Sequence, residues 1–456
     1  MTQDLMTLPH PDAVTALREI SRNRLGFLQL CNQEYGNIVP FQLDDELFCV
    51  LTHPDYITEV LKNRLSFVKA QDIQQLREVL GNGLLTSEGD FWLRQRRLAQ
   101  PIFRKQQIDG YATVMVDYTQ QMLETWQDGA VHDVHEEMMR LTLDIVMKTL
   151  FDRDIQDTAA SSVAHALDAL MNWIEHHEAV DVTTALAEIG ELDAQNSPMS
   201  SEDIDRDYQN AIALFDKTVF SIIRERRASN KTGKDLLGLL MQVEDADDGT
   251  RMSDRQLRDE AATLILAGHE TTANTLTWTW MLLAQHPEVR EQLHAELKTV
   301  LGDRAPTLAD MPQLTYTNWV IKESMRLYPP ATDVWREATQ DSELGGYVIP
   351  KGTTVIASQW AMHRDPRYFN NPEVFQPERW ANDLEKQLPR GVYFPFSDGP
   401  RVCIGKNFAV MEAVLLLATI AQKFQLDLVP EQNIELQPSI TLRARHGIQV
   451  ILKANS

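Results

Sequence analysis

The sequence predicts a mainly α-helical protein with a few small β-sheets. Three observations lead to this expectation: helical periodicity of apolar residues runs through most of the 456 residues, strand-like segments are short and few, and no internal repeat or low-complexity segment interrupts the pattern. Because strand-like segments occur near both ends of the chain, we expect one integrated domain over residues 1–456 rather than several domains on linkers.

The periodic segments define the expected helices in order. They cover residues 54–65, 108–127, 134–152, 160–178, 202–229, 233–243, 254–285, 287–301, 316–328 and 405–423. The expected strands are residues 37–43 and 47–52, two runs within 345–358 separated by the turn signal IPKG, and a last pair near 436–442 and 447–452. The acidic segment 244–254 and the polar, Ser/Asp-rich segment 193–201 are expected to be surface loops, the second either a solvated connection or a lid.

Composition limits the classes of partner. The chain has 43 basic and 66 acidic residues, a formal charge of −23, which argues against nucleic acid or an anionic membrane as the main partner. The N-terminal segment lacks an apolar run long enough for a signal peptide or anchor, and the most apolar stretch, AVLLLATIA, is about half the length that spans a bilayer. We therefore expect a cytoplasmic, monomeric protein without a membrane anchor.

Only one of the three cysteines lies in a distinctive context. The spacing of Cys31, Cys49 and Cys403 excludes a disulfide framework and a compact zinc knuckle, and the first two are interpreted as small apolar core residues. Cys403 lies in FPFSDGPRVCIGKNFAV, between two glycines and directly before a helical pattern. Glycines permit a tight loop, and the positive end of the following helix stabilises a thiolate.

The loop can be written F-x-x-G-x-R-x-C-x-G, and in this form it resembles the haem-thiolate loop of the cytochrome P450 family. The resemblance implies the P450 fold, with haem b between a long central helix and the cysteine loop. It makes Cys403 the axial ligand of the haem iron and places Phe396, Arg401 and Gly405 at the cofactor. Ser397 stands where many members have glycine, and we expect this to leave every role intact.

Two further motifs agree with the resemblance. Glu323 and Arg326, in ESMR, are spaced i, i+3 on one helix face, and taken alone they would be a surface salt bridge. In the family such a pair joins an arginine of a later loop to brace the core on the cofactor side, and Arg379 in FQPERW matches it. Trp92 and Arg96 share a helix face and are either an aromatic packing contact beside an exposed arginine or, by the resemblance, haem-propionate ligands. The resemblance also places Arg336 near a propionate.

AGHETTAN, in the middle of the expected long helix, is one residue short of the H-E-x-x-H zinc motif because Ala273 replaces the second histidine. A zinc hydrolase is therefore excluded. Glu270 in such an apolar helix must be hydrogen-bonded or near water, and Thr271 can bond back to a backbone carbonyl and open the helix locally. The resemblance implies that these two residues supply protons during O2 activation.

The remaining residues of this segment have supporting roles. Ala267 and Gly268 would leave room above the cofactor, whereas His269 and Thr272 are interpreted as structural. The substrate is expected to be hydrophobic, such as a fatty acid, a terpenoid or a similar lipid-like molecule. From the resemblance and their apolar character, the candidate pocket residues are Phe67, Leu84, Trp173, Leu264, Ala331, Val334 and Leu442.

Together these features predict a monooxygenase that activates O2 and hydroxylates its substrate. No G-x-G-x-x-G fingerprint is present, so we expect no fused reductase and electrons that come from NAD(P)H through a ferredoxin or flavodoxin with its reductase. The stretch from Trp92 to Lys105 contains five cations and no acidic residue, and it is either the docking patch or a solvated basic face. A peroxide-driven or isomerising haem enzyme and a haem sensor or electron carrier are the rival functions, and neither needs Glu270 with Thr271.

Overall fold

The computed structural model describes residues 3–153, 163–177 except 164, 168 and 175, 202–229, 233–247 and 249–455. The expected loop over 193–201 and much of the expected helix over 160–178 lie outside the described residues. Contacts between Cα atoms group the chain into two compact units. Unit 1 contains Met1–Ala99, Leu150–Leu266 and Asp333–Ala361, and unit 2 contains Gln100–Thr149, Ala267–Thr332 and Met362–Ser456. The expectation of a single domain stays a prediction.

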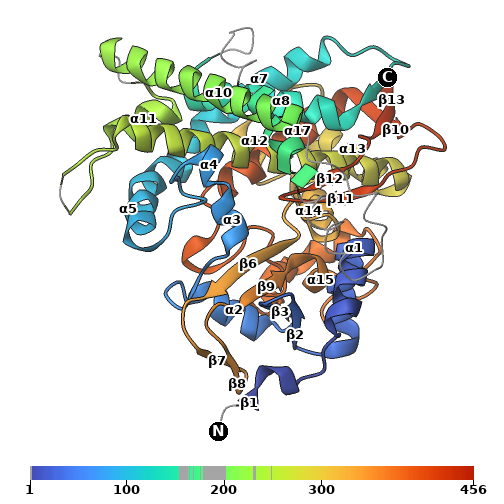
Figure 1. The fold of residues 1–456 in the computed structure, drawn as a ribbon. Coiled ribbons are helices and arrows are strands. Elements are labelled where there is room, and N and C mark those ends of the chain that lie inside the picture. The colour runs from blue at the N-terminus through green and yellow to red at the C-terminus, as the bar shows by residue number, and fades with distance from the viewer. Residues whose placement is uncertain are drawn as a thin grey trace. The chain divides into compact units, whose positions relative to one another are not determined.

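Unit 1 contains a five-stranded sheet with the order β2-β3-β9-β6-β4, of which β2, β3, β9 and β6 are labelled in Figure 1. The strands are β2 Ile38–Leu43, β3 Glu46–Leu51, β4 Phe67–Lys69, β6 Asp333–Ala338 and β9 Thr354–Ser358. Strands β3 and β9 are parallel, and the other pairs are antiparallel. A second sheet joins β1 Gln3–Asp4, β8 Tyr347–Ile349 and β7 Ser342–Leu344. Strands early in the chain therefore pair with strands near residue 350.

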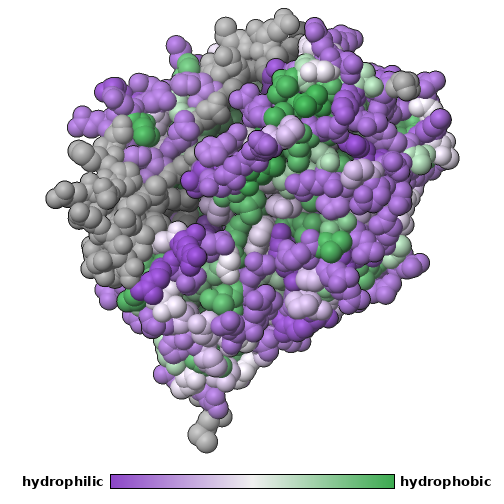
Figure 2. Space-filling model, turned by 90° about the vertical axis from the view of Figure 1, so that its right-hand side faces the viewer, coloured by the Kyte–Doolittle hydropathy of each residue, from purple (hydrophilic) through white to green (hydrophobic). Residues whose placement is uncertain are grey.

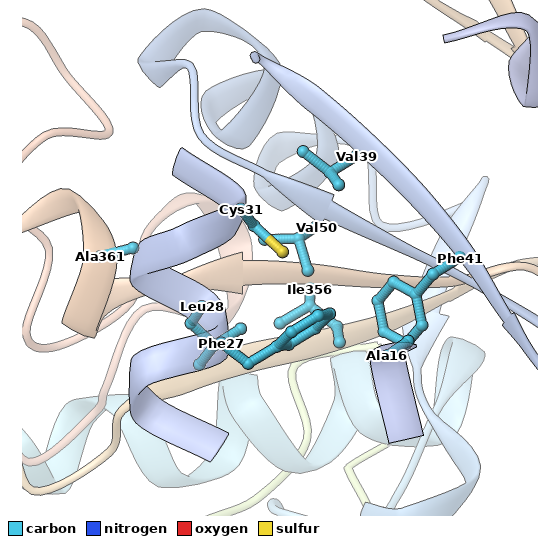
Figure 3. Close-up of a cluster of buried hydrophobic side chains, with 9 residues drawn as sticks. All are labelled: Ala16, Phe27, Leu28, Cys31, Val39, Phe41, Val50, Ile356 and Ala361. Carbon is cyan, nitrogen blue, oxygen red and sulfur yellow. The ribbon is translucent and has the colours of Figure 1, made fainter. Parts of the chain in front are cut away.

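One face of the larger sheet is covered by helix α1, Ala13–Leu30. Figure 3 shows Phe27 and Leu28 of this helix beside Phe41, Val50 and Ile356 of three neighbouring strands, all of them buried. The Phe27 and Phe41 rings meet edge to face with 5.2 Å between centroids. This cluster joins the N-terminal hairpin to strand β9.

The other helices of unit 1 are α2 Pro54–Lys62, α3 Gln71–Gln75, α4 Arg77–Leu80, α5 Gly89–Ala99, α10 Glu202–Ser229, α11 Leu236–Gln242 and α15 Gln359–Met362. Helix α1 was not among the expected helices. Its periodicity is interrupted at Asn23, where the backbone leaves the helical region with φ −162° and ψ 86°. The amphipathic pattern is therefore divided into two short pieces.

Unit 2 is mainly helical. Its helices are α6 Lys105–Ile108, α7 Ala112–Leu123, α8 Val134–Phe151, α13 Pro287–Val300, α14 Thr315–Leu327, α16 Leu384–Gln387 and α17 Lys406–Lys423. Its strands are β5 Val131–Asp133, β10 Phe424–Leu428, β11 Leu436–Pro438, β12 Leu442–Ala444 and β13 Gln449–Ala454. Strands β10, β13 and β5 form one sheet, and β11 pairs with β12 in a separate hairpin.

Helix α12, Asp254–Gln285, is the longest described helix, at 32 residues. It has the predicted bounds, and its residues from Ala267 onward belong to unit 2. At 1.5 Å per residue it is roughly 48 Å long. It starts in the acidic loop after α11 and ends two residues before Pro287, which begins α13 at the first-turn position that proline favours.

The two runs expected within 345–358 are present as β8 and β9 on either side of the turn at IPKG. They belong to different sheets, because β8 pairs with β7 and β1 while β9 pairs with β3 and β6. The last expected pair is wrong, since β11 pairs with β12 and β13 pairs with β10 and β5. Strands β6 and β10 were not expected. Strands β9 and β13 take partners from distant segments, β3 and β5, which local alternation does not reveal.

The surface in one view is mainly hydrophilic. Figure 2 shows a face on which hydrophilic residues predominate and hydrophobic residues form smaller patches. Among the described helices, none combines the length and apolar character needed to cross a membrane.

Candidate active site

The cysteine loop of unit 2 holds Cys403 at its surface. The side chain of Cys403 is exposed, and its backbone N–H donates to the Phe396 carbonyl across 2.9 Å. Helix α17 begins three residues later, with Gly405 as its N-cap. The first N–H groups of a helix lack partners within the helix and carry partial positive charge, so this end of α17 favours an anion nearby.

The two glycines of the loop differ in what they contribute. Gly399 has a φ of +71°, a conformation that other residues adopt at a cost, so the backbone requires glycine there. Gly405 has a φ of −84°, and a Cβ built on it would lie 3.9 Å from the Cys403 sulfur, an ordinary contact. The expectation that both glycines supply unusual backbone angles therefore holds only for Gly399.

Ser397 also adopts the left-handed region, with a φ of +58°. Its hydroxyl is buried and has no hydrogen-bond partner. The next residue, Asp398, caps the short turn that follows through its carboxylate, which accepts from the Gly399 N–H at 2.7 Å, and it pairs with Arg390. Replacement of glycine by serine at this position therefore carries a conformational cost, although the loop still forms.

The other two cysteines are core residues of unit 1. Burial raises the pKa of the Cys31 thiol to about 12 and also raises that of Cys49. Both thiols are therefore neutral at ordinary pH and poor ligands or nucleophiles.

Helix α12 presents small side chains on an accessible face. Ala267 is exposed and Gly268 and Thr271 are partly accessible, although the neighbouring His269 and Glu270 are buried. The Thr271 hydroxyl donates to the Ala267 carbonyl across 2.7 Å, as the sequence suggested. The expected local opening does not accompany this bond, since the helix is continuous from Asp254 to Gln285.

Glu270 is oriented differently from Thr271. Only 1% of Glu270 is exposed, its Oε1 lies 2.7 Å from Nε of Arg443, and it also accepts from the Thr441 hydroxyl. Arg443 and Thr441 belong to the β11–β12 hairpin region, and sequence reasoning missed both. The carboxylate is thus held in an ion pair rather than exposed beside Thr271.

His269 and Thr272, interpreted as structural, are both buried. Burial lowers the pKa of His269 to about 4, so the ring is neutral at ordinary pH. Ala273 is fully buried, and in the described part of the chain no group of three or more His, Cys, Asp or Glu side chains could hold a metal ion.

Glu323, Arg326 and Arg379 form one buried cluster in unit 2. Arg326 donates to both carboxylate oxygens of Glu323 at 2.9 and 2.8 Å, and Nε of Arg379 donates at 3.1 Å. Neither Glu323 nor Arg326 has an exposed side chain, so the alternative of a surface salt bridge is wrong. Trp380, which sequence reasoning missed, donates its indole N–H to the same carboxylate at 2.9 Å.

In unit 1, Lys69 connects two of the predicted propionate ligands. Its ammonium lies 5.9 Å from the ring centroid of the buried Trp92, and it is the cross-strand partner of Arg336 in the β4–β6 pair. Arg336 is 6% exposed and donates to the Trp335 carbonyl. Arg96 is partly buried on the same helix as Trp92. In unit 2, Arg401 is partly buried in the cysteine loop.

The predicted pocket residues differ in accessibility. Phe67 and Leu442 are almost fully buried, and Leu84 is 9% exposed. Leu264, Ala331 and Val334 are partly accessible. Trp173 stacks on Tyr208 at 4.6 Å and donates to Asp205, so α10 occupies its polar edge.

The predicted basic patch is partly neutralised. Nε of Arg94 lies 3.0 Å from Asp245, and Arg97 pairs with Asp245 and with Asp247, at 2.7 Å from the latter. Asp245 is 4% exposed, so the acidic loop after α11 is more than a solvated connection. Arg94 and Arg97 are therefore paired with acidic residues of unit 1, and the docking role of the stretch stays a prediction.

A cavity of about 750 Å³ lies within unit 2 beside the cysteine loop. Phe396, Ser397 and Val402 of the loop line it. Four cations, Lys105, Lys322, Arg390 and Lys406, also line it, together with Asp109, Glu385 and Asp398.

Comparison with known proteins identifies a family, two relatives and a similar solved structure. The cytochrome P450 family model matches residues 12–451. Cyclooctatin synthase of Streptomyces melanosporofaciens is 35% identical over 412 residues, which are 90% of this chain and 87% of that protein. Pentalenene oxygenase of Streptomyces avermitilis is 31% identical over 401 residues, 88% of this chain and 86% of that protein. The crystal structure of the cytochrome P450DA heme domain superposes with a TM-score of 0.86 at 28% identity, covering 98% of both chains.

Proposed function

Because this chain belongs to the cytochrome P450 family of monooxygenases and has its fold, we propose that it hydroxylates a terpenoid with electrons from a separate redox protein. The observation that carries the proposal is the cysteine loop. It exposes Cys403 at the positive end of α17, the setting in which a thiolate ligates haem iron.

The residues fit a haem by the chemistry of their side chains. Cys403 would supply the thiolate, and Phe396 and Gly405 flank it in the loop. Arg336, Arg96 and Arg401 are cations suited to the propionates, and Trp92 adds an indole N–H donor. A thiolate-ligated haem, when bound, supplies the O2 activation and the C–H oxidation.

Residues of α12 would supply protons at the oxygen site and leave room there for O2 and substrate. The accessible Ala267 and Gly268 leave room for O2 and substrate, and the Thr271 hydroxyl lies on the same face. In the role proposed here this hydroxyl holds a proton at the oxygen site, and Glu270 resupplies it through water.

The substrate proposal rests on the relatives and on the apolar candidates. The names of two relatives, cyclooctat-9-en-7-ol 5-monooxygenase and pentalenene oxygenase, refer to terpenoid substrates. The candidate pocket residues of this chain are all apolar, which suits a hydrocarbon skeleton that is positioned by shape. A terpenoid is therefore preferred to a fatty acid, whose carboxylate would require a cation in the pocket.

The redox partner is proposed to dock at the cavity beside the cysteine loop. Lys105 is exposed there, and Lys406 is exposed at the start of α17. A small acidic ferredoxin or flavodoxin would be attracted to such cations, and the attraction would weaken with salt. This location replaces the part of the predicted patch that Arg94 and Arg97 were expected to supply.

The first test is the absorption spectrum of the dithionite-reduced, CO-bound protein. A thiolate-type Soret band that is lost in Cys403→Ser and kept in Cys49→Ala is expected. A histidine-type band, or no haem, would overturn the proposal. Cyclic terpene hydrocarbons and alcohols are then compared with fatty acids for a spin-state shift and for hydroxylated product, and turnover of fatty acids alone would refute the terpenoid assignment.

Docking is tested by reduction rates with an acidic ferredoxin. Lys105→Glu and Lys406→Glu should slow reduction at low salt, and their reduction rates should converge with the wild-type rate at high salt. Arg94→Glu should change the salt dependence of the reduction rate less. Equal rates at low salt would place the partner elsewhere. The monomeric state and the cytoplasmic location stay predictions, to be checked by size-exclusion chromatography and cell fractionation.

A further inference from the structure

Helix α12 is tied to the hairpin β11–β12 by side chains spaced four residues apart. Glu270 accepts from the Thr441 hydroxyl, and the amide of Asn274 donates to the same hydroxyl at 3.0 Å. One turn further on, the indole N–H of Trp278 donates to the Leu442 carbonyl at 3.0 Å. These three contacts follow one stripe of the helix surface.

Leu442 is fixed from both sides of its backbone. Its N–H donates to the Pro330 carbonyl at 2.8 Å, while its carbonyl accepts from Trp278. The Trp278 ring also stacks on Tyr328 with 4.8 Å between centroids. The hairpin and residues 328–331 are therefore held together through Leu442 and Trp278, and the candidate substrate contacts Leu442 and Ala331 lie in these two segments.

The ion pair between Glu270 and Arg443 is the charged part of this assembly. Nε of Arg443 lies 2.7 Å from Oε1 of Glu270, and the side chains are 15% and 2% exposed. A buried carboxylate without its cation is strongly destabilised, because its charge has lost both water and a counter-charge. The ion pair with Arg443 therefore keeps Glu270 bound to the hairpin.

Other titratable groups face this pair without replacing Arg443. His269 on α12 and His135 on α8 interact with both charges, and burial lowers the pKa of each ring. Asp133 interacts with His135. Since both rings are largely uncharged near neutral pH, Arg443 is the permanent cation among these groups.

We propose that Arg443 is a positioning residue of the oxygenation reaction, because it holds the Glu270 carboxylate on the hairpin. Proton delivery next to Thr271 therefore depends on the position of the strand that carries Leu442. The proposal rests on the proposed function, in which Glu270 resupplies the proton that the Thr271 hydroxyl holds at the oxygen site. A substrate that touches the hairpin thereby affects proton delivery as well as binding.

The chain offers a matched control. Arg445 lies two residues away and pairs with Glu435 at 3.4 Å, with both side chains about half exposed. Arg445→Gln removes the same charge from the same hairpin without touching Glu270. Arg443→Lys keeps the charge but loses the shape of the guanidinium, and Thr441→Val removes only the hydroxyl.

The first measurement is hydrogen exchange of the amides in residues 436–444 in the haem-loaded enzyme without turnover. Arg443→Gln and Glu270→Gln should each speed exchange about tenfold, and Arg445→Gln should leave it unchanged. Should Arg443→Gln fail to fold, Arg443→Lys and Thr441→Val must show an intermediate increase. Unchanged exchange in these variants would overturn the proposal.

The second measurement is the division of electrons between product and peroxide. Arg443→Gln should raise the peroxide yield severalfold and alter the solvent isotope effect on turnover, with partial rescue by Arg443→Lys. A variant that only loosens the fold would lose haem or activity without changing this ratio, and that result would overturn the proposal. Absence of any oxygenation by wild type would refute the proposed function instead, while the exchange data would still report whether Arg443 holds the hairpin.

Discussion

Replacement of Glu323 by glutamine tests whether the buried charge cluster supports unit 2. The carboxylate accepts two hydrogen bonds from Arg326 and one each from Arg379 and Trp380, and a fourth donor is the backbone N–H of Gln376 at 3.1 Å. Glutamine keeps the size but presents an NH2 group to donors and leaves two arginines without a counter-charge.

The magnitude follows from burial. Glu323 and Arg326 have no exposed side-chain surface, and Arg379 has 7%. Breaking such a pair by neutralising one partner costs about 3–5 kcal/mol. Because folded domains are stable by about 5–15 kcal/mol, the variant should lose a large part of its free energy of unfolding.

The assay is urea unfolding followed by both the Soret band and far-UV circular dichroism, since a haem protein need not unfold in one step. Glu385→Gln is the control, because Glu385 pairs with Lys322, the neighbour of Glu323, at 2.6 Å on the surface. The control should cost no more than about 1 kcal/mol. A loss for Glu323→Gln that is as small as the control's would refute the reasoning that burial decides the strength of this cluster.

Three further predictions concern single side chains. Ser397→Gly should raise the free energy of unfolding by about 1 kcal/mol, because it relieves a φ of +58° and removes a buried hydroxyl without a partner; a lower melting temperature would contradict this. Glu412→Gln should remove a pH dependence of the free energy of unfolding. Burial raises the pKa of Glu412 to about 8, so the folded state keeps a proton that the unfolded state releases above about 4.5. The free energy of unfolding therefore falls as pH rises between these values, by up to about 1.4 kcal/mol per pH unit. An equally steep decline in the variant, measured by urea unfolding from pH 5 to 8, would exclude Glu412 as its source. Finally, a thiol reagent at pH 8 should leave Cys31 and Cys49 unmodified in the native protein and label them in urea, and native labelling at either position would show that its site opens.

The charge cluster shows how far a motif reaches. Glu323, Arg326 and the later Arg379 match a motif of the family, and this resemblance predicted that the three meet. The sequence did not reveal that Glu323 and Arg326 are fully buried, or that Trp380 also donates to the carboxylate. Burial of these side chains depends on other segments that pack over helix α14. The local sequence of those segments does not indicate that they pack there.

The basic patch shows the opposite case. Five cations without an intervening acid are a property of a short stretch, but the field at a surface depends on every charge nearby in space. Asp245 and Asp247 come from a loop far along the chain, and they neutralise Arg94 and Arg97. The stretch alone therefore overstates the positive charge that Arg94 and Arg97 present to a partner, whereas its docking role stays a prediction.

The polar pair in α12 combines both lessons. A carboxylate in an apolar helix must find a partner or water, and the sequence left both options open for Glu270. The structure assigns the partner to Glu270, through Arg443, and leaves accessibility to Thr271. The two adjacent residues point to different environments because successive helical positions differ by about 100° around the axis. If they act together on oxygen, water must reach the carboxylate while Arg443 stays paired with it, and the position of the hairpin that carries Arg443 then decides how close that water comes to Thr271.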